Sequence, residues 1–313
     1  MGSQQEVASA PGPGVGALGE ELGRQQHGDP VLRRVGRGVR KAVGGSGVSG
    51  QRGQDEIAEL LRRQVPGCRQ LAVASVRGGA GKTTLTALVA AELARQRGDR
   101  VLAMDADAEL GSLPLRLGVP SERSLLDLVG RVPRSFEEVA PYLTRTPEGL
   151  WVLPSATGGR IAEEFTLGTF QAALGAVVRY FSAAVIDCSA GILTELHQGI
   201  LAGAHGFVLV TPATVDGALS ARGALEWFAG NNQQALLSRT VVAMMARAPQ
   251  VAADLDQAQE MLSAWGIPVV QVPFDRHLST GGALDQSKLA ESTRIAVSRV
   301  TYEAFARSLN PGR

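Results

Sequence analysis

The sequence is poor in the residues that build metal centres and cross-links, since its 313 residues include two cysteines and four histidines. Cys68 and Cys188 fall in or beside apolar runs and have no C-x-x-C or other metal-ligand spacing, which argues against an iron–sulfur site and a disulfide. The histidines His27, His197 and His205 form no ligand cluster. The sequence therefore predicts neither a cysteine-rich metal centre nor a redox-active cysteine pair.

Long hydrophobic runs are also missing. No apolar stretch approaches the ~18–20 residues that span a bilayer, and the first residues do not form a signal peptide. Neither charge sign is in excess, because 31 Lys and Arg stand against 30 Asp and Glu. We therefore expect a cytoplasmic protein, with the inner face of the plasma membrane as an alternative peripheral location. The balanced charge argues mildly against general DNA binding.

Glycine, by contrast, is plentiful, and three glycines stand in the stretch Val76–Thr84, V-R-G-G-A-G-K-T-T. This stretch follows the apolar run 71–76 and precedes an amphipathic helical pattern over 85–96, so it lies at a strand-to-helix turn. Glycines let the backbone turn its N–H groups toward phosphate oxygens, while Lys82 supplies a positive charge and Thr83 a hydroxyl for Mg²⁺. We predict a phosphate-binding loop that comprises Gly78, Gly79, Ala80, Gly81, Lys82, Thr83 and Thr84.

Two further apolar runs end in carboxylates. The run 101–104 leads to Asp105 and Asp107, and the run 183–186 leads to Asp187. The carboxyl ends of parallel strands border the crevice in which α/β proteins bind ligands. All three carboxylates are therefore candidate site residues.

A cation followed by G-G-x-G-K-T resembles the deviant Walker A motif of the MinD/ParA superfamily of P-loop ATPases. In that family a signature lysine, at the position of Arg77, reaches across a nucleotide-sandwiched homodimer to the partner's phosphates. The resemblance implies ATP and Mg²⁺ as ligands, slow hydrolysis, and a water positioned by Asp107. Arg77 keeps the charge, but its planar fork binds phosphate differently from an ammonium. The resemblance implies catalytic roles for Asp107, Lys82 and Arg77, and metal ligands at Thr83, Asp105 and Asp187.

The adenine site departs from the family pattern, because Met245 stands where many members carry Asn. Pro273 and the backbone around Asp275 are the predicted base contacts, and His277 is expected to form structural hydrogen bonds. The motif 272–285, V-P-F-D-R-H-L-S-T-G-G-A-L-D, is similar to the EspI-like group of MinD/ParA-like proteins associated with actinobacterial type VII (ESX) secretion. The resemblance extends from about residue 57 to residue 309.

Strand-like runs alternate with helix-length stretches over most of the chain, at 206–211, 240–245 and 269–272 among others. This alternation predicts an α/β fold of the P-loop NTPase class, a mostly parallel twisted sheet with helices on both faces. We assign residues 56–313 to this ATPase domain, with a short helix over 54–63 at its edge and a last helix over 288–309.

Residues 1–55 are predicted to be a flexible, Gly-rich N-terminal segment. Within it, residues 31–43 place valines four apart among basic residues, which is typical of a basic amphipathic helix. Membrane, a secretion-machinery protein and DNA are its candidate partners, in that order, and a solvated tail without function is the alternative.

Three functions fit these patterns. The first is an ATP-dependent dimerisation switch with slow, partner-stimulated hydrolysis, which exerts spatial or regulatory control over a larger assembly such as a type VII secretion apparatus. The second is a non-catalytic nucleotide-binding adaptor. The third is a ParA-type DNA-partition ATPase.

Overall fold

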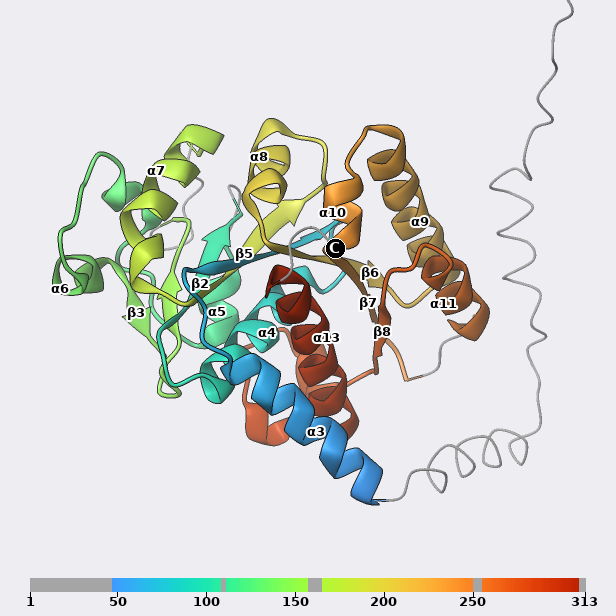
Figure 1. Cartoon of the computed structure of the whole chain (residues 1–313). Helices are drawn as coiled ribbons and strands as arrows, with labels where there is room; N and C mark the ends of the chain where they lie inside the picture. Colours follow the sequence, from blue (N-terminus) through green and yellow to red (C-terminus); the bar gives the residue numbers. More distant parts are fainter. Residues whose placement is uncertain (1–46, 108–110, 157–164, 250–254, 310–313) are drawn as a thin grey trace, which may run out of the picture.

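The computed structural model describes residues 47–107, 111–156, 165–249 and 255–309 (Figure 1). The basic segment 31–43 lies outside the described residues. No helix in the described part of the chain is both long and apolar enough to cross a membrane.

An eight-stranded sheet forms the centre of the molecule, in the order β3-β4-β2-β5-β1-β6-β7-β8. All neighbouring pairs are parallel except β3 with β4, so the predicted α/β sheet is confirmed. The inner strands consist of apolar runs without alternation because helices cover both of their faces. The strands are β1 (Arg69–Ser75), β2 (Val101–Ala106), β3 (Thr144–Arg145), β4 (Trp151–Leu153), β5 (Ala183–Ala190), β6 (Gly206–Pro212), β7 (Thr240–Met245) and β8 (Val269–Val272).

Two helical layers cover the sheet (Figure 1). One face packs against α7 (Leu167–Val177), α8 (Glu195–Gly203), α9 (Val215–Gly230) and α11 (Leu255–Ser263). The other face packs against α3 (Gly47–Arg62), α4 (Lys82–Gln96) and α13 (Glu291–Leu309). The shorter α-helices are α5 (Leu113–Leu117), α6 (Phe136–Val139), α10 (Gln234–Ser238) and α12 (Arg276–Ser279). The 3-10 helices are η1 (Leu125–Leu128), η2 (Ala140–Tyr142), η3 (Val178–Tyr180) and η4 (Gln286–Lys288).

Helix α3 is longer than the sequence indicates, since it begins at Gly47 rather than near residue 54 and crosses residue 55 without a break. Arg97 binds the carboxyl end of α3 to the rest of the domain. The Arg97 guanidinium donates to the carbonyl oxygens of Leu61 at 2.8 Å and Arg63 at 3.1 Å, and it lies over the Phe305 ring. These two carbonyls are among those that a helix end leaves unpaired, so one buried side chain satisfies them.

The pairing of β1 with β5 contains a bulge near the carboxyl ends of the two strands. Val73 is opposite Asp187, but Ser75 is opposite Ala190, so β5 holds one residue more than β1 over this interval. The extra residue shifts the alternation of side chains beyond Asp187. The last side chains of β5 therefore point to the opposite face of the sheet from the one they would take in a regular strand, and the following loop begins from there.

Candidate functional site

The loop between β1 and α4 has the backbone of an anion cradle. Gly79 and Gly81 have φ values of 72° and 94°, in the left-handed region that glycine enters most readily. Helix α4 begins at Lys82, and its N-cap residue is Gly81, so no N-cap side chain competes with a ligand for the first N–H groups of the helix. This backbone is compatible with phosphate binding, and the assignment of residues 78–84 as a phosphate-binding loop stays a prediction.

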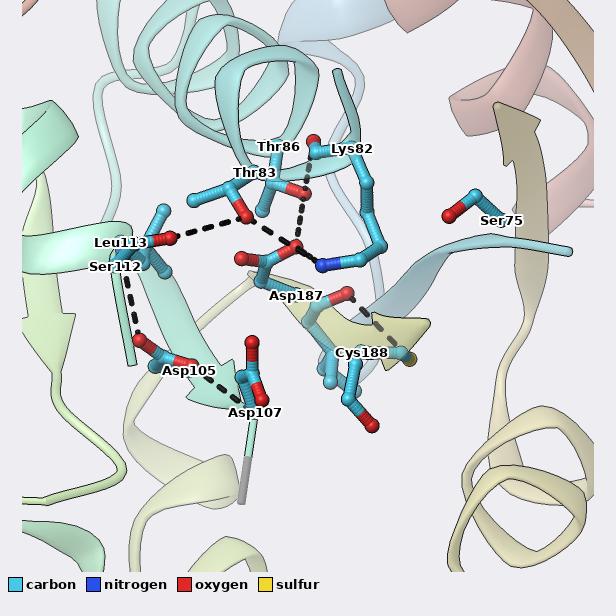
Figure 2. Close-up of polar contacts among 12 residues, drawn as sticks. Ser75, Lys82, Thr83, Thr86, Asp105, Asp107, Ser112, Leu113, Asp187 and Cys188 are labelled. Carbon is cyan, nitrogen blue, oxygen red and sulfur yellow. Dashed lines mark hydrogen bonds and ion pairs between the residues drawn. The ribbon is translucent and has the colours of Figure 1, made fainter. Parts of the chain in front are cut away.

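Lys82 points from the start of α4 into the site, where its side chain is 10% exposed. Its Nζ lies 3.2 Å from Asp187 Oδ1 and 3.4 Å from Thr83 Oγ1 (Figure 2). The Thr86 hydroxyl donates to the same Asp187 oxygen at 3.0 Å. The lysine therefore forms an ion pair with the carboxylate at the end of the apolar part of β5.

Asp105 and Asp187 are opposite each other on the neighbouring strands β2 and β5, and both are fully buried. Burial and the Asp187 charge raise the pKa of Asp105 to about 8, although the N–H groups of Asp107 and Leu113 donate to it and oppose the rise. Burial also raises the pKa of Asp187, against the influence of Lys82. Two buried carboxylates side by side are costly unless a cation joins them.

The residues predicted to bind Mg²⁺ converge on one space (Figure 2). Asp187 Oδ2 is buried and has no hydrogen-bond partner among the described residues. Thr83 Oγ1 faces the same space, where it lies 3.4 Å from Ser112 Oγ and 3.4 Å from Lys82 Nζ. Within the described ranges no group of three or more His, Cys, Asp or Glu residues could hold a metal alone. This donor set fits Mg²⁺, which proteins usually bind through one or two carboxylates together with substrate phosphates.

Asp107 follows β2 directly, is half-buried, and donates its N–H to Asp105 Oδ1 at 2.9 Å. Its side chain lies on the same side of the strand ends as Asp187 (Figure 2). The segment after it, 108–110, lies outside the described residues. The water-positioning role of Asp107 remains a prediction.

Arg77 lies at the outer rim of the site. Its side chain is 58% exposed and forms an ion pair with Asp216, in the first turn of α9. Its carbonyl oxygen accepts a hydrogen bond from the Ser75 hydroxyl at 2.8 Å. In the described part of the chain, the Arg77 guanidinium thus turns toward its own chain and pairs with an exposed carboxylate.

The proposed base contacts are only partly free. Asp275 accepts hydrogen bonds from the N–H groups of Ala290 at 2.9 Å and His277 at 2.8 Å. Burial acts to raise the pKa of Asp275, but the Ala290 N–H and the other donors around it outweigh burial and lower that pKa. Its carboxylate is thus occupied within the protein, and its carbonyl oxygen also accepts the Ser279 N–H at 3.2 Å. His277 Nε2 accepts the N–H of Asp285 at 2.8 Å, which is the structural role expected of it.

Two side chains from the end of β7 contact the phosphate loop. A Cβ at Gly81 would lie 3.4 Å from the Met245 side chain, and a Cβ at Gly79 would lie 3.3 Å from Arg247 Nη1. Arg247, which is exposed, was not among the predicted site residues. Its only signal in the sequence is a basic residue just after an apolar strand. It adds a further positive charge beside the cradle.

Comparison with known proteins agrees with this geometry. Residues 71–287 match the family model described as CobQ/CobB/MinD/ParA nucleotide binding domain. The ESX-1 secretion-associated protein EspI of Mycobacterium tuberculosis is 34% identical over 237 residues, which cover 72% of this chain and 35% of EspI. The chain thus spans well under half of that relative. A putative septum site-determining protein MinD of Guillardia theta is 31% identical over 144 residues, or 46% of this chain and 53% of that protein.

Solved structures show the same fold. A ParA family ATPase from Chlorobium tepidum superposes with a TM-score of 0.63 at 16% identity, covering 75% of this chain and 98% of that one. The septum site-determining protein MinD from Pyrococcus horikoshii, complexed with Mg-ADP, superposes with a TM-score of 0.59 at 20% identity, covering 75% and 94%.

Proposed function

Because the chain belongs to the CobQ/CobB/MinD/ParA family of nucleotide-binding domains, we propose that it is an ATP-operated dimerisation switch that hydrolyses ATP slowly. The observation that carries this proposal is the convergence of Lys82, Thr83, Asp105 and Asp187 beneath a glycine cradle, with Arg77 exposed at its rim. The first four residues serve the nucleotide and its metal. Arg77 serves a second copy of the chain.

The residues divide the chemistry between them. The N–H groups at the start of α4 and the Lys82 ammonium bind the β and γ phosphates. Thr83, Asp105 and Asp187 would hold Mg²⁺, which when bound would neutralise charge that develops on the transferred phosphoryl group. Asp107 orients the attacking water from the end of β2. Hydrolysis is slow until a partner completes the site.

Arg77 has a stronger partner available in a dimer than in the monomer. Its pair with Asp216 is exposed on both sides, at 58% and 67%, and exposed ion pairs contribute only about 0.2–1 kcal/mol. A charge-assisted hydrogen bond to phosphate contributes about 1.5–3 kcal/mol, so two symmetric contacts supply roughly 3–6 kcal/mol. Moving an equilibrium from 1:99 to 99:1 takes about 5.5 kcal/mol. When the two lost Asp216 pairs are subtracted, the arginines supply about 1–6 kcal/mol, which is a large part of the free energy that ATP-dependent dimerisation needs.

Solution mass by light-scattering chromatography tests this proposal. Wild type should be monomeric with ADP and should double in mass with ATP and Mg²⁺, whereas Arg77→Ala should stay monomeric in both. Arg222→Ala is a matched control, because it removes a surface ion pair of the same kind, with Glu226, from α9 without altering the rim. Equal masses of wild type in ADP and ATP would count against the switch.

The switch is proposed to regulate a larger assembly, most specifically a type VII secretion apparatus. Support for this step is the 34% identity to EspI, whose name links it to ESX-1 secretion. In the source organism, Lys82→Ala should change the amount of type VII substrates in the culture filtrate without lowering the level of the protein. Unchanged secretion would leave the nucleotide switch in place but remove this output.

A nucleotide-binding adaptor without hydrolysis is the second candidate. The observation that favours it is Arg77, which stands at the position of the family's signature lysine and forms an ion pair with Asp216 of its own chain. An adaptor would bind ATP and release no phosphate even when dimeric. A single-turnover phosphate-release assay on the ATP-bound protein separates it from the switch.

A further inference from the structure

A buried histidine lies directly behind the loop that follows β5. His197 is 2% exposed and belongs to the first turn of α8. Its Nε2 lies 3.0 Å from the carbonyl oxygen and 3.1 Å from the hydroxyl oxygen of Ser189, and its Nδ1 lies 2.5 Å from the Thr194 hydroxyl. With the proton on Nε2, the ring donates to the Ser189 carbonyl oxygen and accepts from Thr194. With the proton on Nδ1, it donates to Thr194 and accepts from the Ser189 hydroxyl. In either tautomer the imidazole joins Ser189 to Thr194.

These two contacts hold both ends of one short loop. Ser189 is at the end of β5, and Thr194 is the residue that caps α8. Between them is Gly191, with a φ of 105°, whose Cβ position would be 3.9 Å from His197 Cε1. The imidazole thus supports the underside of the loop from within the protein.

The same loop is tied to the phosphate cradle on its other side. The Gly191 N–H donates to the Ser75 carbonyl oxygen at 2.8 Å, and the Ser75 hydroxyl donates to the Arg77 carbonyl oxygen at 2.8 Å. His197 is therefore linked to the start of the cradle. Its bond to Ser189 holds the loop, the Gly191 N–H of that loop bonds to Ser75, and Ser75 bonds to Arg77, the residue proposed to contact a second copy.

We infer that His197 is a positioning residue that fixes the 189–194 loop where the terminal phosphate of the nucleotide arrives, so that the protein binds ATP more tightly than ADP. This inference rests on the proposed function and adds the means by which the third phosphate is sensed. At 2% exposure His197 touches no nucleotide, so it acts through the backbone it holds.

The histidine is suited to this role because it stays neutral. Burial lowers the pKa of His197, and the nearby Lys82 charge lowers it further, whereas the Ser189 carbonyl and Asp107 act in the opposite direction. A neutral imidazole offers one donor and one acceptor at opposite corners of a rigid ring. Few side chains place both groups at this separation.

Two substitutions separate the contacts of His197. In His197→Gln, the amide can reach the position of Nε2 and retain the bond to Ser189. In His197→Asn, the shorter amide reaches only the position of Nδ1 and loses Ser189. His205 provides the control, because it is a half-buried histidine that also has a main-chain partner, the Gln70 N–H at 3.1 Å, but it lies at the opposite ends of the strands.

The experiment measures two quantities on wild type, His197→Asn, His197→Gln and His205→Asn. The first is the dissociation constant of Mg²⁺ with AMP-PNP and with ADP. The second is amide hydrogen exchange over 189–194 without nucleotide. We expect His197→Asn to weaken AMP-PNP binding about three- to tenfold, the scale of one hydrogen bond, to change ADP binding less than about twofold, and to speed exchange in the loop. We expect His197→Gln and His205→Asn to behave like wild type in that loop.

Other results overturn the inference. Equal weakening of both nucleotides by His197→Asn would mean a general structural role, and unchanged exchange over 189–194 would mean that His197 does not hold the loop. If wild type binds neither nucleotide, the proposed function fails. In that case faster loop exchange in His197→Asn but not in His197→Gln still supports the positioning, and its absence refutes it.

Discussion

The buried pair Asp105 and Asp187 should make the nucleotide-free protein less stable as the pH rises. Asp105 has an ordinary pKa of 3.8, raised in the fold to about 8 by burial and by Asp187. Between these two values the native state binds more protons than the unfolded state, so the free energy of unfolding falls with increasing pH. Below pH ~4 both states are protonated, and above pH ~8 both are ionised, so the slope is confined to this window.

The size of the effect follows from the shift. Each pKa unit corresponds to about 1.4 kcal/mol, and a shift of about four units gives at most ~6 kcal/mol over the whole window. Total stabilities of domains are about 5–15 kcal/mol, so even half of this loss is measurable by denaturation. Mg²⁺ with nucleotide should reverse the loss of stability, because a divalent cation offsets the repulsion between the two ionised carboxylates.

The assay is urea denaturation between pH 5 and 9 in EDTA, on wild type and Asp105→Asn. The substitution removes the titrating carboxyl group. The free energy of unfolding of wild type minus that of the variant should therefore decrease as the pH rises. The absolute stability of Asp105→Asn is a poor readout, because one of the two N–H groups that donate to Asp105 loses its acceptor at a cost of about 1–3 kcal/mol. Asp216→Asn, which alters an exposed carboxylate, is the control. Parallel pH curves for wild type and Asp105→Asn would refute the reasoning.

Three further predictions address other parts of the structure. Asp107→Ala should bind ATP but stay dimeric for longer than wild type, and a variant that remains monomeric at saturating ATP by light scattering would contradict its assigned role. Gly217→Ala should lower the free energy of unfolding by about 1–3 kcal/mol, because its Cβ would lie 2.1 Å from a main-chain carbonyl oxygen at the end of β6. Gly223→Ala, on the same helix with nothing within 4 Å, should instead stabilise by about 0.5–1 kcal/mol, and equal effects in urea melts would be inconsistent with this packing. Burial raises the pKa values of Cys68 and Cys188 to about 12, so both thiols should react slowly with a disulfide reagent at pH 8 until the protein unfolds.

The sequence was sufficient for the parts of the site whose signal is local. The phosphate loop is a run of nine residues, and Asp105 and Asp187 each end an apolar strand. Parallel strands bring such ends together, which is why their convergence could be predicted without coordinates. The strands β7 and β8 were also predicted at their observed bounds, since short apolar runs with clear ends leave little choice.

Other features depend on contacts between distant segments. The two-residue strand β3 is too short to show a periodic pattern, and it forms through antiparallel pairing with β4. The start of α3 at Gly47 was missed because residues 47–53 contain three glycines, which disfavour a helix. Arg247 and His197 are single residues in ordinary loop or helical sequence. Only the fold brings Arg247 beside the cradle and His197 against the loop that follows β5.

The bulge between β1 and β5 limits which sequence changes this chain can accept in evolution. Substitutions near the carboxyl end of β5 keep the extra residue, and with it the face from which the loop begins. Removal of one residue there would restore a regular ladder and turn every following side chain to the other face of the sheet. Insertions and deletions should therefore be far rarer than substitutions at this point, so homologous chains should align without gaps from Asp187 to the first turn of α8 even where their residues differ.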